Sequence, residues 1–275
     1  SNSDLNKFYL KIIKSLKEIK DNLQITVIGG LSNLVNTGKN SQIVGEINKM
    51  ITITNSLVSG YDNSGNILVR TNVAGESNLI SNTINTIVQG KNNQVFSDNL
   101  SNVNGFSNEL NTTTGILVGG DNNNLSNTKR DLVQGKDNTI INSNDSVIVG
   151  ESHSTTNSDR MAIFGNNQTL NGSMNSIISG NTNSETTADN NTIVGHLNSI
   201  TSTSNTIVSG KSNTVSDSSN CEIGGDGNTI NNGDNSIVSG KGHSITDSSN
   251  VLVFGLSNQV QTNSLNSLVS GKSHV

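Results

Sequence analysis

β-branched side chains return at a fixed interval along almost the whole chain. Val or Ile residues recur every 15 residues, with one final interval of 16. They are Ile28, Ile43, Val58, Val73, Val88, Val103, Val118, Val133, Ile148, Ile163, Ile178, Ile193, Val208, Ile223, Val238, Val253 and Val269. Each stands two residues before a glycine, in a series that runs from Gly30 to Gly271. So short a period predicts a stack of 15-residue coils.

We number each coil from its glycine as position 0. A second apolar position follows at +5, in residues such as Ile140, Leu170 and Val215. Because β-branched residues suit a pleated surface, each coil is expected to hold two short strands, one at each apolar position. The glycine is expected where a side chain would clash or where φ must be positive.

Position +3 is polar in every coil. It is Asn in most of them, Gln168 once, and a histidine at His153, His243 and His274. Stacked Asn side chains can hydrogen-bond to their equivalents in the coils above and below. The three histidines are therefore interpreted as members of this ladder, because groups on separate coils do not converge on a metal or a substrate.

The other face of the first strand is also partly apolar. Positions −3 and −1 point away from −2, and an apolar residue alternates between them, as in Ile207 with Ser209 and Thr192 with Val194. A strand that is apolar on both faces needs something packed outside it, and another copy around a symmetry axis is the economical candidate. The predicted trimer interface consists of Leu57, Ile87, Leu117, Phe164, Ile177, Val194, Ile207, Ile237 and Phe254.

The N-terminal segment has a different pattern. Between residues 4 and 24, apolar residues such as Leu5, Ile12 and Leu16 recur at helical spacing. We expect an amphipathic helix within residues 1–23, either capping the first coil or forming a short three-helix coiled coil, and the two roles are compatible. Residues 24–275 are expected to form an all-β parallel solenoid of about 17 coils.

Composition narrows the function classes. Only 30% of residues are hydrophobic and 3% aromatic, but the strict period excludes a disordered chain. A net charge of −5 without a basic stripe argues against nucleic-acid binding. No run of apolar residues is long enough to span a membrane and no signal peptide is present, so we expect a fragment that is anchored, if at all, through a C-terminal part absent here. The single Cys221 is interpreted as a small residue at −4.

No constellation for catalysis stands out, so we predict neither an enzyme nor a cofactor. The Gly- and Asp-rich run at residues 224–228 resembles a calcium-binding nonapeptide, but it occurs once and such sites need tandem copies. A hexapeptide acyltransferase would have an 18-residue coil, whereas the coil here has 15 residues. An ice-binding surface would show a regular Thr ladder, but Thr is irregular in this chain. A polysaccharide groove would need acidic pairs and aromatic platforms, which the sequence lacks. No metal site is predicted.

A recurring run resembles a known family. Asn-Ser/Thr-Ile-Val-Ser-Gly followed by Lys-Ser-Asn-x-Val/Ile, best seen at residues 205–215 and 235–245, is similar to the head repeats of trimeric autotransporter adhesins. Partial copies occur at residues 175–180 and 266–271. The resemblance implies a left-handed parallel β-roll, a homotrimer, and a virulence-related adhesin anchored in the bacterial outer membrane. It also implies a host-cell surface protein as partner, with a CEACAM-type glycoprotein as one candidate. The family's usual coil is slightly shorter and richer in Ala.

Departures from the repeat predict the receptor site. The second turn, positions +6 to +10, is small and polar in most coils but apolar in the first third of the chain. The predicted receptor-binding residues are Ile53, Tyr61, Ile67, Leu68, Arg70, Phe96, Leu100 and Phe106. Alternatively, these side chains fold over the roll, pack on the N-terminal helix or fill the interchain groove. The basic residues Lys129, Arg130 and Arg160 are interpreted as solvated turn residues. The competing function is a passive spacer or phage-type fibre segment without its own receptor site.

Overall fold

The chain divides into two compact units, Ser1–Asp121 and Asn122–Val275. The computed structural model describes residues 27–28, 34–39, 42–44, 46, 49–55, 57–61, 64, 68–70, 72–81, 84–85, 87–97 and 99–274. The helix predicted within residues 1–23, and the domain boundary after it, lie outside these residues. Within the described part of the chain all regular structure is β, and each unit is a parallel solenoid of 15-residue coils.

Unit 2, Asn122–Val275, alternates strands of two sheets. The glycine sheet contains the glycine of each coil, and its strands are β15 (Leu132–Lys136), β17 (Val147–Glu151), β19 (Ala162–Asn166), β21 (Ile177–Asn181), β23 (Thr192–His196), β25 (Ile207–Lys211), β27 (Glu222–Asp226), β29 (Ile237–Lys241), β31 (Leu252–Leu256) and β33 (Leu268–Lys272). The second sheet contains β14 (Asn124–Ser126), β16 (Thr139–Ile141), β18 (Ser154–Thr156), β20 (Thr169–Asn171), β22 (Ser184–Thr186), β24 (Ser199–Thr201), β26 (Thr214–Ser216), β28 (Thr229–Asn231), β30 (Ser244–Thr246) and β32 (Gln259–Val260). The two strands predicted for each coil are thus confirmed.

Unit 1, Ser1–Asp121, has the same glycine sheet but a more varied second layer. Its glycine-sheet strands are β1 (Val27–Ile28), β3 (Gln42–Val44), β5 (Leu57–Ser59), β7 (Asn72–Ala74), β9 (Ile87–Lys91), β11 (Asn102–Phe106) and β13 (Leu117–Asp121). The second layer contains β8 (Leu79–Ser81), β10 (Gln94–Ser97) and β12 (Glu109–Asn111). A separate three-stranded sheet is made by β2 (Leu34–Lys39), β4 (Lys49–Thr54) and β6 (Leu68–Val69).

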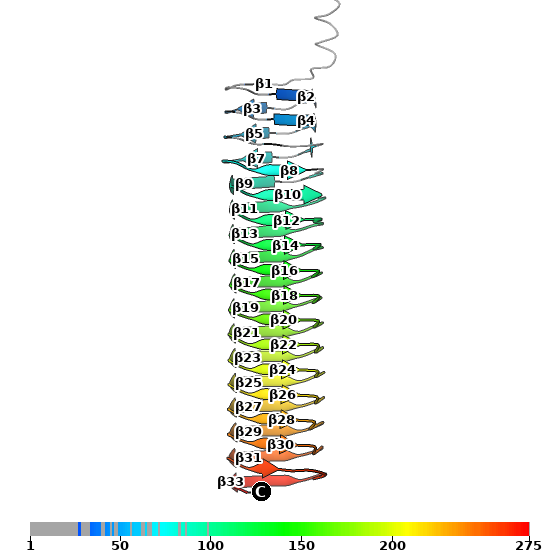
Figure 1. Cartoon of the computed structure of the whole chain (residues 1–275), viewed down its shortest axis with the longest axis vertical. Helices are drawn as coiled ribbons and strands as arrows, with labels where there is room; N and C mark the ends of the chain where they lie inside the picture. The colour runs from blue at the N-terminus through cyan, green and yellow to red at the C-terminus, as the bar shows by residue number, and fades with distance from the viewer. Residues whose placement is uncertain are drawn as a thin grey trace, which may run out of the picture. The chain divides into compact units, whose positions relative to one another are not determined.

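Within each unit the strands stack in parallel, each on the strand one coil away (Figure 1). The register equals the sequence period: Val208 pairs with Ile223 and Thr214 with Thr229. The interval of 16 residues before the last glycine is absorbed without loss of register, since Val253 pairs with Val269. Identical positions are therefore vertical neighbours, and the sequence pattern translates directly into columns of side chains.

The core of each unit consists of such columns. The Val and Ile residues at −2 and the apolar residues at +5 are buried from β14 to β32 of unit 2, as with Ile193 and Ile200, whereas Val269 in the last strand is half-buried. Gly210 shows why the glycine is needed: its φ is +112°, and a Cβ there would overlap the carbonyl oxygen of Gly225 in the next coil. Both reasons expected for the glycine, a positive φ and a clash, are confirmed.

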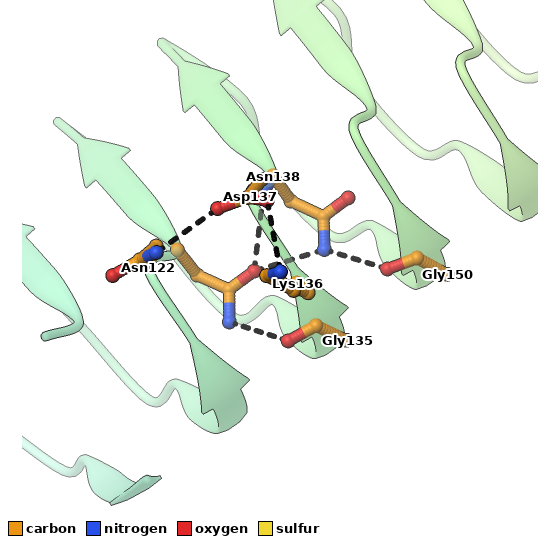
Figure 2. A network of polar contacts seen from close by, with 7 residues as sticks. Asn122, Gly135, Lys136, Asp137, Asn138 and Gly150 are labelled. Atoms are coloured by element: carbon orange, nitrogen blue, oxygen red, sulfur yellow. Dashed lines mark hydrogen bonds and ion pairs between the residues drawn. The ribbon is translucent and has the colours of Figure 1, made fainter. Parts of the chain in front are cut away.

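Within each unit the column at +3 forms a hydrogen-bond ladder, and Figure 2 shows the part around Asn138. The Asn138 amide Nδ2 donates to Oδ1 of Asn123 at 2.9 Å and to the carbonyl oxygen of Gly150 at 3.0 Å. The Asn138 backbone N–H donates to the same Oδ1 at 3.3 Å. One side chain thus joins three successive coils and satisfies backbone groups beside the glycine.

Candidate interaction surfaces

The outer face of the glycine sheet in unit 2 carries a row of exposed apolar side chains. Ile177 is 49% exposed and Ile207 is 50% exposed, although both belong to strands, β21 and β25. The row comprises Val147, Phe164, Ile177, Val194, Ile207, Ile237 and Phe254, and we call it the zigzag face. Six of these seven residues belong to the predicted trimer interface; Val147 is the addition.

From β19 to β25 the zigzag face alternates large and small residues in both columns. At −3, Ile177 lies between Ala162 and Thr192 of the neighbouring strands. At −1, Val194 lies between Ser179 and Ser209. Over these four strands the large residue changes column from one strand to the next, so the pattern repeats every 30 residues and each large side chain stands beside a small one. The alternation is broken elsewhere, as at Glu222 with Gly224 in β27 and at Leu252 with Phe254 in β31. Such a surface has knobs and holes at a pitch of two coils, about 10 Å at normal strand spacing.

Unit 1 shows a sparser version of the same face. Leu57, Ile87 and Leu117 are exposed at −3, again 30 residues apart. The −1 column between them holds Ser59, Ala74, Gln89 and Asn104, which are small or polar residues. The predicted interface residues of unit 1 therefore form one column and not two.

The predicted receptor-binding residues fall into two groups. Tyr61, Arg70, Leu100 and Phe106 are exposed, whereas Phe96 is half-buried. Ile67 lies outside the described residues. Leu100 lines a shallow depression together with Ile87 and Leu117, so a predicted receptor residue adjoins the predicted trimer interface.

Three of the predicted receptor residues do not lie in turns. Ile53 belongs to β4 and pairs with Leu68 of β6, and Phe96 lies in β10. The prediction of a turn at Ile53 and Leu68 is therefore wrong. The β-branched run Ile51–Thr54 continues the strand where other coils turn, because such residues favour extended backbone.

The +1 column of unit 1 holds an ion pair between two aromatic residues. Lys91 Nζ lies 3.0 Å from Glu76 Oε2. Phe106 is the register partner of Lys91, and Tyr61 lines a shallow depression with Glu76. Tyr61 and Phe106 thus flank an exposed ion pair, and this set of four residues is called the +1 patch.

The histidines at +3 make ladder contacts like those of the asparagines. The His153 Nδ1 accepts a hydrogen bond from the Gln168 backbone N–H at 3.2 Å, and its Nε2 faces the Val149 carbonyl oxygen at 3.3 Å. Burial lowers the pKa of His153, which favours the neutral ring. His243 makes the equivalent contacts with Asn258 and Ser239. His274 is exposed, but its backbone N–H still donates to Oδ1 of Asn258 at 3.0 Å. The interpretation of these residues as ladder members is confirmed.

Cys221 is a buried hydrogen-bond donor. Its Sγ lies 2.9 Å from the carbonyl oxygen of Gly233, and burial raises the pKa of the thiol. A raised pKa disfavours the thiolate, so this side chain is not an activated nucleophile.

Two buried carboxyl groups were missed by reasoning from the sequence. Glu185 stands at +5 and Asp131 at −4, both inward positions, and both are fully or almost fully buried. The available signal was the break in each column: a charged residue replaces an aliphatic one at 185 and a small one at 131.

Among the described residues, no three His, Cys, Asp or Glu side chains gather closely enough to hold a metal ion. In the same part of the chain, no helix is long and apolar enough to cross a membrane.

No protein-family model matches the chain, and no curated protein does. Solved structures with some likeness include a proposed acetyltransferase from Desulfovibrio desulfuricans, 8% identical, matched over 88% of this chain and 68% of that one with a TM-score of 0.17. A UDP-N-acetylglucosamine acyltransferase from Arabidopsis is 14% identical, with 91% and 69% covered and a TM-score of 0.15. TM-scores this low carry no argument about this chain's fold or activity.

Proposed function

We propose that the chain is the head of a homotrimeric bacterial surface adhesin, a left-handed β-roll without enzymatic activity that binds a host-cell surface protein. The observation that carries the proposal is the zigzag face. A chain with 30% hydrophobic residues places seven large apolar side chains on one outer face of unit 2. A solvated sheet face would be polar, so this face is best explained by a partner.

A second copy of the chain is the partner that fits best. From β19 to β25 large and small residues alternate with a pitch of two coils, and a complementary surface must repeat at that pitch over these coils. The same face of another copy does so by construction, and closed rotational symmetry lets identical faces converge on one axis. The threefold symmetry, the hand of the coil and the location at the outer membrane rest on the resemblance of residues 205–215 and 235–245 to adhesin heads.

Light scattering coupled to size-exclusion chromatography tests the assembly. The chain has a mass of 28.8 kDa, and a species of three times that mass is expected. Ile177→Asp combined with Val194→Asp should give monomers, because each buries an unpaired charge in the interface. Leu197→Asp is the matched control, since Leu197 is 46% exposed but lies outside the zigzag face. A monomeric wild type would refute the proposal.

The receptor site is proposed on unit 1, where the +1 patch and Leu100 expose aromatic and apolar groups. Aromatic residues dominate the energetics of many protein interfaces. Replacing both Tyr61 and Phe106 by Ser should abolish capture of host-cell membrane protein while the trimer persists. Leu197→Ser is the control for loss of an exposed apolar group elsewhere. Unchanged capture by the double variant would contradict this assignment.

A passive spacer is the second candidate, and the regularity of unit 2 favours it. Its second turns are small and polar over many coils, as in residues 216–220 and 246–250. A trimer that captures no host-cell protein through either unit would support the spacer.

A further inference from the structure

Glu185 is enclosed by aliphatic side chains in the column at +5. Its register partners are Leu170 of β20 and Ile200 of β24, and its own exposure is 0%. In this column an ionised carboxylate would lose its hydration without gaining a cationic partner. The position is therefore the least favourable in the coil for a charge.

The hydrogen bonds of Glu185 do not compensate for this burial. Oε1 accepts from Ser176 Oγ and from Asn191 Nδ2, both at 2.8 Å. Oε2 is buried and has no partner. Asn191 Nδ2 also reaches Thr203 Oγ1 at 3.2 Å, so the group belongs to a small neutral polar cluster. Neutral donors stabilise a carboxylate less than a cation does.

Asp131 repeats this arrangement at another position of the coil. It is 2% exposed, its Oδ1 accepts from the Ser146 backbone N–H at 2.8 Å, and Oδ2 is buried without a partner. Two carboxyl groups of unit 2 thus each hold one unsatisfied oxygen in the core.

The charges near both groups are acidic. Asp189 is the charged residue that acts on Glu185, and Asp145 and Asp159 act on Asp131. Arg130 is bound to Asp145, and among the described residues no ion pair reaches Glu185 or Asp131. The strands beside Glu185 present Leu170 and Ile200, and Ser146 faces Asp131.

Burial raises the pKa of Glu185 from 4.5 to about 7, and hydrogen bonds from Asn191 and Ser176 oppose the rise. Burial likewise raises the pKa of Asp131 from 3.8 to about 7. A folded-state pKa above the unfolded value means that the folded chain holds the proton more tightly. The stabilisation is complete below about pH 4 and is lost as the pH rises towards and through 7.

We propose that Glu185 and Asp131 are neutral carboxylic acids in the folded core and make unit 2 a pH-responsive segment, more stable in mild acid than in mild alkali. Above neutral pH, folding either leaves two unpaired negative charges among aliphatic and neutral polar side chains or admits water to these coils. For Glu185, local opening of the second sheet is expected at β20, β22 and β24.

Urea unfolding of the full chain at pH 5 and pH 8, followed by far-ultraviolet circular dichroism, tests the proposal. The carboxyl contribution to the unfolding equilibrium constant should rise on the order of a hundredfold per group between these pH values. Glu185→Gln with Asp131→Asn should remove that contribution. Glu151→Gln, which changes an exposed carboxylate of the +1 column, should leave it intact. The lowered pKa of His153 has the opposite effect, because protonation of this buried ring below about pH 6.5 destabilises the fold. The test therefore compares the pH dependence of the wild type with that of the variant.

Infrared spectroscopy of the wild-type chain gives a second test that does not depend on the variants folding. At pH 6 exposed carboxylates are ionised, so a protonated carboxyl C=O band should come from the buried pair and vanish by pH 9. The proposal is overturned if this band is absent at pH 6. It is also overturned if the double variant keeps the full pH dependence of the wild type.

Discussion

Each unit has a glycine sheet of the same kind, but the two units differ in the second layer. In both, the glycine sheet keeps the same register, as with Val73 on Val88 in unit 1 and Val208 on Ile223 in unit 2. In the second layer, β4 of unit 1 covers six residues from +4 to +9, whereas β26 of unit 2 covers three, from +4 to +6. The glycine side of the coil is thus constant, and the opposite side follows the local sequence.

The backbone conformation at +7 explains this difference. In unit 2 this position turns the chain with a left-handed φ, as at Asp217 (48°) and Asn232 (54°). Asn, Asp, Ser and Gly tolerate that conformation well. The first three coils of unit 1 have the β-branched residues Thr37, Thr52 and Ile67 there. Isolated threonines at Thr112 and Thr187 still turn, so it is the run of β-branched neighbours that keeps β4 extended.

The largest effect is expected from substitutions in the glycine column, which tests whether the glycine sheets of the two units are equivalent. Gly90→Ala in unit 1 and Gly225→Ala in unit 2 should each lower the free energy of unfolding by about 3 kcal/mol or more, because the Cβ meets backbone of the next coil at a φ near +115°. Chemical denaturation measures the loss. Gly227→Ala is the control: nothing lies within 4 Å of its Cβ, and about 1 kcal/mol is expected. A mild effect in one unit alone would show that the two glycine sheets differ.

The Asn ladder gives the next largest effect. Asn93→Ala and Asn213→Ala each remove a side chain that bonds the carbonyl of a glycine, Gly105 at 2.9 Å and Gly225 at 3.1 Å. Leaving such buried groups unpaired should lower stability by about 1–3 kcal/mol in either unit.

Asn213→His is the matched variant for the ladder, and it should lose about 1 kcal/mol or less. His153 already performs this role, accepting a backbone N–H of the next coil. If His were as damaging as Ala in the same denaturation assay, hydrogen bonding would not be what the column requires.

The smallest effect is expected at position +2, where the chain turns with a left-handed φ in both units. Leu197 has a φ of 55° and is largely exposed, whereas its unit 1 counterpart Asn92 has a φ of 56°. Leu197→Asn should raise the free energy of unfolding by about 0.5–1 kcal/mol, and Asn92→Leu should lower it by a similar amount. Equal and opposite shifts in thermal unfolding would establish that this corner is the same in both units, and unequal shifts would not.

Much of the scaffold could be predicted from the sequence, and particular residues show why the rest could not. The 15-residue coil, its two strands, the glycine and the ladder role of His153 follow from a repeat whose equivalent positions are vertical neighbours. The strand at Ile53 was predicted as a turn because the repeat was extrapolated across residues with a strong local preference for extended backbone. Glu185 and Asp131 do not follow from the repeat, because each is an exception to the residue type that its column shares.

The period of the sequence determined the coil, the register and which positions point inward, because a residue that recurs every 15 positions meets its own equivalent in each neighbouring coil. Only the tertiary structure decided how each exception is accommodated. It placed Leu100 beside Ile87 and Leu117, set Tyr61 and Phe106 around an ion pair, and left one oxygen of Glu185 and one of Asp131 without a partner. Those outcomes depend on burial and on contacts between columns, and a one-dimensional pattern does not contain them.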